Sequence, residues 1–113
     1  MNEARPSIKF EDFSKVDIRI GTVSSAEEIE GSDKLIKMQV DFGDMGTRQI
    51  LAGIKAWYSP EDLVGRQIPF IINIEPRKMM GFESRGMVLA VDSDEKAVLL
   101  LPEESVENGA LVK

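Results

Sequence analysis

The segment from Asn73 to Met87 carries the side chains in this sequence that are best suited to hold a ligand. Its functional groups are cations, an amide, a hydroxyl and thioethers, which belong to Arg77, Lys78, Arg85, Asn73, Ser84, Met79, Met80 and Met87. Cationic side chains attract anionic groups, and the flexible methionine side chain packs on irregular apolar partners. Connections within a domain commonly have about two to six residues, so this segment is longer than a turn requires. We therefore predict a binding surface here.

Catalytic chemistry has few candidate groups in this chain. The sequence contains no cysteine and no histidine, which excludes disulfides, cysteine nucleophiles, histidine general bases and the usual zinc sites. Carboxylates could still bind Mg²⁺ or act as acids and bases. The closely spaced ones lie at residues 27–30 and 92–95, and such charge runs are typical of solvated turns. We also find no nucleotide-cradling loop and no nucleophile–base pair. The sequence therefore predicts a protein that is not an enzyme and that uses no cofactor and no metal.

The formal charge of −6 is distributed unevenly. Residues 92–113 hold six acidic and two basic residues, so they account for −4 of this charge, and residues 1–91 carry the remaining −2. Binding of a polyanion depends on the local field over a groove and not on the total charge. The net acidity therefore does not exclude a polyanionic partner for residues 73–87.

The chain's length and composition indicate one folded domain spanning residues 1–113. Its 113 residues, 42% of them hydrophobic, are enough to bury a core. No apolar run reaches the roughly 20 residues of a membrane span, and the start lacks the apolar segment of a signal peptide. We therefore expect a cytoplasmic protein without a membrane partner, in which residues 1–7 form a flexible arm. The initial Met1 favours a free-standing protein over an excised domain.

Alternating hydrophobicity predicts strands in the first half of the chain. A short helical turn is expected at residues 10–13, and a strand then begins at Val16 and shifts parity at Gly21–Thr22, which predicts a bulge or bend there. Residues 36–42 alternate strictly between apolar and polar side chains, residues 43–46 form a glycine-containing turn, and residues 47–52 return. These two segments predict a β-hairpin.

A short helix is predicted to follow the third strand. Ser59 suits the N-cap, Pro60 suits the first helical position, and Gly65 ends the helix. Trp57 and Tyr58 precede this helix. We expect them to fill the core beneath it, although an exposed aromatic ring could instead stack on a nucleic-acid base.

Three further apolar runs complete the predicted fold. Strands are expected at residues 67–74, 86–91 and 97–101, with Pro69 near an edge or bulge because proline cannot donate to a ladder. Five strands with a helix between the third and fourth describe an all-β OB-fold, a five-stranded Greek-key barrel that often binds oligonucleotides. The sixth strand is surplus to that barrel. We predict that this C-terminal extension is covered by a second copy in a homodimer.

In order and spacing, four motifs resemble the tRNA-binding domain of methionyl- and some tyrosyl-tRNA synthetases. That domain also occurs in cytokines of the endothelial-monocyte-activating type and in small free-standing dimeric tRNA-binding proteins. The resemblance runs from Phe10 to Leu111. Its motifs are residues 16–21 (VDIRIG), 31–35 (GSDKL), 48–54 (RQILAGI) and 73–87.

The resemblance implies an OB-fold that grips tRNA by its shape and backbone, without catalysis and without a preferred tRNA. The resemblance further implies that the protein acts in trans or as an accessory subunit or domain of a methionyl-tRNA synthetase. The matching tRNA-binding residues are Asn73, Lys78, Ser84, Met87 and Lys34. A lysine suits a phosphate, amide and hydroxyl groups suit ribose or base edges, and a methionine suits an unstacked base. By charge and location alone, further phosphate contacts are Arg48, Lys55, Arg77 and Arg85.

Two alternatives remain open at this point. A secretion-chaperone branch shares the fold and is similar at residues 17–23 and 58–67, which would make the chain a binder of unfolded polypeptides, with Met79, Met80 and Phe82 near an apolar groove. In a purely structural interpretation, these three residues close the end of the barrel. The cations of the same segment, Arg77, Lys78 and Arg85, would then pair with Glu75 and Glu83.

Overall fold

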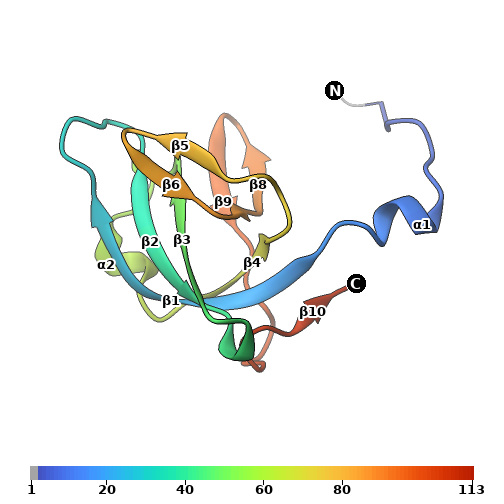
Figure 1. The fold of residues 1–113 in the computed structure, drawn as a ribbon. Coiled ribbons are helices and arrows are strands. Elements are labelled where there is room, and N and C mark those ends of the chain that lie inside the picture. The colour runs from blue at the N-terminus through green and yellow to red at the C-terminus, as the bar shows by residue number, and fades with distance from the viewer. Residues whose placement is uncertain (1–2) are drawn as a thin grey trace.

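An antiparallel sheet curves into a nearly closed barrel in the computed structural model, which describes residues 3–113 (Figure 1). Its strands run in the order β3-β2-β1-β4-β7, and β10 pairs with β1 beside this path. Their bounds are Ile18–Glu28 (β1), Ile36–Asp41 (β2), Thr47–Ala52 (β3), Gln67–Ile71 (β4), Met87–Val88 (β7) and Leu111–Val112 (β10). The fold is OB-like and all-β in class, as predicted.

The remaining elements are short and lie outside this sheet. Two separate hairpins pair β5 (Arg77–Met79) with β6 (Phe82–Ser84), and β8 (Ala90–Ser93) with β9 (Lys96–Leu99). The helices are α1 (Phe10–Phe13), the 3-10 turn η1 (Gly43–Met45) and α2 (Pro60–Leu63). The predicted helical turn at residues 10–13 and the helix between the third and fourth strands are both confirmed.

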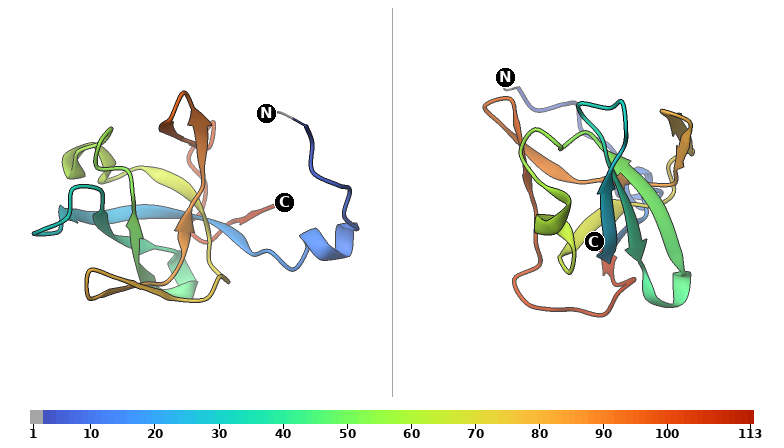
Figure 2. Two further views of the ribbon diagram at one scale, coloured as in Figure 1. Left: turned by 90° about the horizontal axis from the view of Figure 1, so that it is seen from above. Right: turned by 90° about the vertical axis from the view of Figure 1, so that its left-hand side faces the viewer.

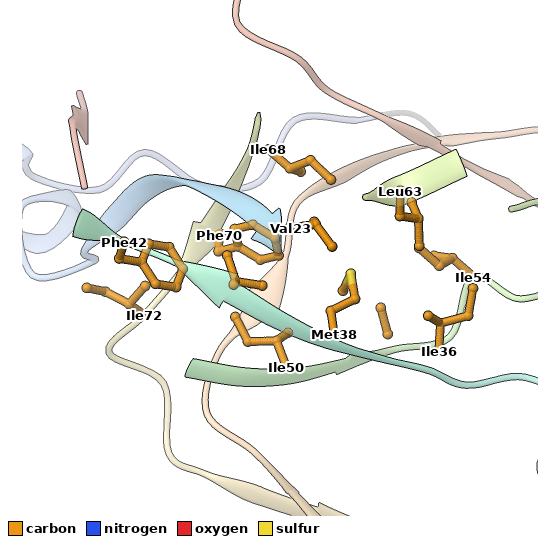
Figure 3. Packing of buried hydrophobic residues seen from close by; sticks show 12 residues of the cluster. Val23, Ile36, Met38, Phe42, Ile50, Ile54, Leu63, Ile68, Phe70 and Ile72 are labelled. Atoms are coloured by element: carbon orange, nitrogen blue, oxygen red, sulfur yellow. The ribbon is translucent and has the colours of Figure 1, made fainter. Parts of the chain in front are cut away.

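The alternating pattern of β2 is the clearest sequence signal, and it builds the centre of the core. Ile36, Met38 and Val40 are fully buried, whereas Lys37 and Gln39 between them are only partly covered. Met38 pairs in register with Ile50 of β3, and Figure 3 shows both side chains within the buried cluster. Beside them, the rings of Phe42 and Phe70 meet edge to face, with centroids 5.6 Å apart, which is a favourable aromatic geometry.

The shift of parity along β1 is real, but the register slips later than predicted. Pairing with β2 shifts between Val23 and Ser25, not at Gly21–Thr22. Gly21 instead faces the core together with Val23, and a Cβ there would lie 2.5 Å from Cγ1 of Val40. Gly21 is therefore needed for close packing against β2.

The start of α2 follows its sequence signals, but Trp57 does not fill the core. The Ser59 N and Oγ both donate to Oδ2 of Asp62, at 3.2 and 2.9 Å. Tyr58 packs against the core, and its hydroxyl accepts a hydrogen bond from Leu99 N. Trp57 is 40% exposed, whereas Ile54 and Leu63 on either side of it in the sequence are buried in the core. The core prediction is wrong for Trp57.

The second half of the chain is more broken than the apolar runs predicted. β4 ends at Ile71, three residues before the predicted end, although Ile72 N still donates to Asp17 O, its neighbour in the β1–β4 register. The predicted fifth strand is interrupted at Leu89 into β7 and β8. The predicted sixth strand becomes β9, and in the described part of the chain its only strand partner is β8.

Pro69 lies inside β4 and has no backbone N–H to donate, but the ladder with the short neighbouring strand β7 does not reach it. β7 pairs only with Phe70 and Ile71, and the Pro69 carbonyl accepts from Leu89 N just beyond that ladder. Pro69 therefore lies near a strand edge, as predicted, because β7 ends before it and, within residues 3–113, leaves this edge of β4 without a paired strand.

The N-terminal segment projects away from the barrel (Figure 2). Residues 3–9 are exposed and form neither helix nor strand, and part of the predicted arm, residues 1–2, lies outside the described residues. Flexibility of the arm stays a prediction. Within residues 3–113, no helix has the length and apolar character needed to cross a membrane.

Candidate nucleic-acid interface

The predicted binding segment is folded mainly as the β5–β6 hairpin and is not an irregular loop. Met80 and Gly81 form its two-residue turn with φ values of 52° and 82°. Two consecutive positive φ angles are typical of the turns that match the twist of paired strands. The hairpin therefore presents its side chains on a regular two-sided scaffold.

Two connections meet at one end of the barrel (Figure 1). The β1–β2 connection holds Gly31 and Lys34, and a Cβ at Gly31 would lie 3.6 Å from Cε of Met80 at the hairpin tip. In an OB-fold, the loop between strands one and two and the loop between strands four and five are common ligand-binding elements. These are the β1–β2 connection and the hairpin-containing connection between β4 and β7.

Strand alternation divides the hairpin into a barrel-facing side and an outward side. Arg77 pairs in register with Ser84, which is only 3% exposed, so this pair faces the barrel. Lys78 pairs with Glu83, and both are exposed on the opposite side. The predicted residues Lys78 and Ser84 therefore lie on different sides of one hairpin.

A small pocket of about 40 Å³ lies between the hairpin and the barrel. Its walls include Leu51, Ile74, Arg77, Met79, Ser84 and Met87. The predicted residues Ser84 and Met87 are thus brought together, with Arg77 beside them. Met87 is 39% exposed and Met80 at the tip is 52% exposed, so thioether groups are available at the surface.

Four of the predicted cations are free of ion pairs. Arg77, Lys78, Arg85 and Lys34 are exposed, and within residues 3–113 none has a carboxylate oxygen within 4.0 Å of its charged group. Pairing of the hairpin cations with Glu75 and Glu83, the structural alternative, is therefore not observed. These side chains can accept an external anion without first breaking an ion pair.

Asn73 uses its side chain to hold the N-terminal segment. Its Oδ1 accepts from Asp17 N at 2.8 Å, and its Nδ2 donates to Lys15 O at 2.6 Å. Both ends of the amide are thus engaged with the backbone. Asn73 lies at the entry to the hairpin. Its amide was expected to contact a ligand, but both of its polar atoms are hydrogen-bonded within the protein.

Ser84 is likewise engaged inside the protein. Its Oγ accepts from Leu51 N at 3.0 Å and donates to Gly86 O at 3.1 Å. The hydroxyl therefore satisfies a backbone donor of β3 that would otherwise be buried without a partner. Direct contact of this hydroxyl with a ligand conflicts with its burial.

The structure assigns Arg48 and Lys55 to internal contacts. Nη1 of Arg48 donates to Ile72 O at 2.6 Å and to Arg85 O at 3.3 Å. Nζ of Lys55 donates to Ser32 O at 2.9 Å and lies 3.4 Å from Glu28 Oε1. Charge and location alone predicted phosphate contacts for Arg48 and Lys55. In the structure Arg48 is bonded to carbonyl oxygens, and Lys55 is bonded to a carbonyl oxygen and close to a carboxylate.

Sequence reasoning missed two glutamines beside the hairpin. Gln39 of β2 and Gln49 of β3 are directly paired, and Nε2 of Gln49 reaches Glu83 O at 2.9 Å. The signal was present, since both residues alternate with core residues and therefore face outward on adjacent strands. The alternation does not predict that Gln49 contacts the hairpin.

The comparisons with known proteins agree with this geometry. Residues 18–111 match the family described as "Putative tRNA binding domain". That match covers most of the chain. The chain belongs to this tRNA-binding domain family.

Relatives in the family include methionine–tRNA ligases. The chain is 52% identical over 106 residues to that of Methanococcoides burtonii, covering 93% of this chain and 16% of the ligase. It is 44% identical over 110 residues to that of Campylobacter jejuni, covering 97% of this chain and 18% of the ligase. The chain thus spans less than a fifth of these enzymes and corresponds to a non-catalytic type of domain within them.

Two solved structures share the fold over 96% of this chain. A protein from Pyrococcus horikoshii related to methionyl-tRNA synthetase has a TM-score of 0.91 and 36% identity, covering 96% of this chain and all of that chain. The chaperone CsaA from Bacillus anthracis has a TM-score of 0.86 and 39% identity, with the same coverage. A protein related to methionyl-tRNA synthetase and a chaperone are therefore both close structural counterparts of this chain.

Proposed function

We propose that this chain binds tRNA without catalysing a reaction, and that the β5–β6 hairpin is its principal contact. The observation that carries the proposal is a set of three exposed cations, Arg77, Lys78 and Arg85, on a connection that OB-folds use for oligonucleotides. Among the described residues, none of the three forms an ion pair. Phosphate contacts from such side chains provide affinity and orientation without reading base sequence. Recognition is therefore of tRNA shape and backbone, with no preferred tRNA.

The proposed roles of the predicted residues follow their environments. Lys78, Arg77 and Arg85 contact phosphates, Lys34 extends the contact onto the β1–β2 connection, and Met87 packs on an unstacked base. Asn73 and Ser84 belong to the site as residues that hold its backbone in place, since their polar groups are already bonded.

We also propose a cytoplasmic setting and a link to methionyl-tRNA synthetase, supported by the related methionine–tRNA ligases. The chain supplies tRNA to the synthetase in trans or as an accessory subunit or domain. Pull-down of the synthetase with this chain, with and without ribonuclease, separates direct association from association through tRNA.

A homodimer is the proposed assembly. An apolar depression of about 300 Å³ lies among Ile20, Pro69, Leu100, Leu101, Val106 and Leu111, and Leu101 is 55% exposed. Apolar surface of this kind is favourable to cover. Light scattering should give a dimer for the wild type and a monomer for Leu101→Asp. A monomeric wild type would contradict the assembly.

The deciding experiment is tRNA binding by fluorescence anisotropy across a salt series. Wild-type binding should weaken with salt, and Lys78→Ala should bind more weakly with a slope of log K against log salt that is shallower by about 0.7–0.9. Lys96→Ala is the matched control, because Lys96 is an exposed lysine on β9, outside the hairpin. Absence of wild-type binding at low salt would refute the proposal.

Polypeptide binding is the second candidate function, favoured by the 39% identity to the chaperone CsaA. Exposed thioethers at Met80 and Met87 suit adaptable apolar contacts. An unfolded peptide added as a competitor in the same assay distinguishes the two functions. Tight peptide binding without tRNA binding would assign this chain to the chaperone function.

A further inference from the structure

The β5–β6 hairpin does not share a backbone ladder with the barrel. It forms its own two-stranded sheet, and each strand has only three residues. An isolated two-stranded hairpin is at best marginally stable in water. Its orientation must therefore be maintained by contacts with other elements.

These contacts come mainly from side chains of β3 and β6. Gln49 Nε2 donates to Glu83 O at 2.9 Å, and Ser84 Oγ accepts from Leu51 N at 3.0 Å. One backbone hydrogen bond, from Arg85 N to Gln49 O at 2.8 Å, also joins the end of the hairpin to β3. We call the set Arg48, Gln49 and Ser84 the β3 seam.

Arg48 has the most connected position in the β3 seam. Its half-buried guanidinium donates from Nη1 to Ile72 O and to Arg85 O, at 2.6 and 3.3 Å. Ile72 precedes the hairpin segment and Arg85 follows β6, so one charged donor ties the entry of the segment to its exit. Hydrogen bonds from a charged donor are stronger than those between neutral groups.

Groups on β2 support this arrangement. Gln39 Nε2 donates to Gln49 Oε1 at 3.0 Å, which orients the Gln49 amide so that its nitrogen faces Glu83 O. Lys37 Nζ lies 4.1 Å from the centroid of the Phe82 ring and 2.7 Å from Glu27 Oε1. The hairpin is thus held at its base by Arg48, in its middle by Gln49, and nearer its tip by Lys37.

We propose that Arg48 and Gln49 are positioning residues that keep the hairpin in its binding-competent orientation without touching the ligand. The inference rests on the proposed function for the identity of that ligand, tRNA. A hairpin that is competent for only part of the time binds with an apparent Kd raised by the inverse of that fraction. Phosphate contacts in the bound state are unchanged, so the salt dependence does not change.

The test compares Arg48→Met and Gln49→Leu with the wild type in two measurements. Arg48→Met keeps an apolar stem but removes the donors, and Gln49→Leu removes the amide at similar size. Tm alone would not separate positioning from general stability, so Ile68→Val serves as the control. Ile68 is a fully buried core residue of β4, and this change lowers Tm without altering the β3 seam.

The first measurement is amide hydrogen exchange of residues 77–85 without RNA. Both seam variants should exchange there at least about fivefold faster than Ile68→Val under conditions where all are folded. The second is tRNA affinity across the salt series. Both variants should bind about fivefold or more weakly, with an unchanged salt slope.

Three results would overturn the proposal. A salt slope shallower by about 0.7–0.9 in Arg48→Met would make Arg48 a phosphate contact. Exchange no faster than in Ile68→Val, or tRNA affinity equal to that of the wild type, would show that the β3 seam does not position the hairpin for binding. If the wild type binds no tRNA, the proposed function fails, and the exchange measurement still tests whether the seam holds the hairpin.

Discussion

Lys78 and Glu83 lie directly opposite each other on the outward side of the β5–β6 hairpin. Directly paired strand residues have Cβ atoms about 4.5–5.5 Å apart, although no ion pair within 4.0 Å joins these two side chains among the described residues. A ligand phosphate near Lys78 therefore also experiences the negative potential of Glu83. The carboxylate of Glu83 therefore lowers the affinity of the hairpin for phosphate.

Glu83→Gln should therefore strengthen tRNA binding. We expect the Kd to fall about two- to fivefold at low salt, because a charge that repels phosphate has been removed. The gain should shrink at high salt, where the screening length falls to about 3 Å at 1 M. Anisotropy measures both effects. Glu104→Gln, in the exposed acidic segment after β9, is the control and should leave the Kd unchanged; weaker binding by Glu83→Gln would contradict a phosphate at Lys78.

Ser84→Ala should destabilise the fold. The change leaves Leu51 N buried without its acceptor, and a loss of about 1–3 kcal/mol in the free energy of unfolding is expected. Urea denaturation checks this value. Ser93→Ala, at an exposed position of β8, should stay within about 0.5 kcal/mol of the wild type. Equal stability of the two variants would mean that the Ser84 hydroxyl is not needed to satisfy Leu51.

Gly21→Ala should destabilise the barrel, whereas Gly53→Ala should not. The new methyl group at position 21 would meet Val40 Cγ1 at 2.5 Å and Phe42 Cε1 at 2.7 Å, and overpacking of this kind costs about 1–3 kcal/mol. Nothing lies within 4 Å of a Cβ at Gly53. Thermal unfolding of the two variants gives the comparison. An unchanged Tm for Gly21→Ala would show that β1 can move away from β2 freely.

The pKa of Asp62 should depend on Ser59. Hydrogen bonds from the Ser59 hydroxyl and then from its backbone N–H stabilise the carboxylate and hold its pKa below the ordinary value of 3.8. Since the folded pKa is depressed, the associated stability is present above pH about 4 and is lost as pH falls through the folded pKa. Carboxyl NMR titration should show the pKa of Asp62 rising toward 3.8 in Ser59→Ala, and changing less in Arg66→Gln. The same Asp62 pKa with and without the Ser59 hydroxyl would count against this account.

The sequence by itself determined the barrel and the connection on which the proposed site lies. Alternation over residues 36–42, the return at residues 47–52 and the Ser59–Pro60 helix start are local signals, because side-chain period and capping depend on near neighbours. The absence of cysteine and histidine is likewise a property of the sequence alone, and it limits the chemistry that the chain can perform.

Only the tertiary structure decided which polar groups of the site are free. Asn73, Ser84 and Arg48 have side chains typical of ligand contacts, yet each is bonded to the backbone. Asn73 bonds residues 15 and 17, Ser84 bonds residues 51 and 86, and Arg48 bonds residues 72 and 85. Lys78 has the same residue type as Lys55, but Lys55 is tied to Ser32 and Glu28. A donor's partner depends on which carbonyl the fold brings within about 3 Å, and that distance is set by strand pairing across the whole chain.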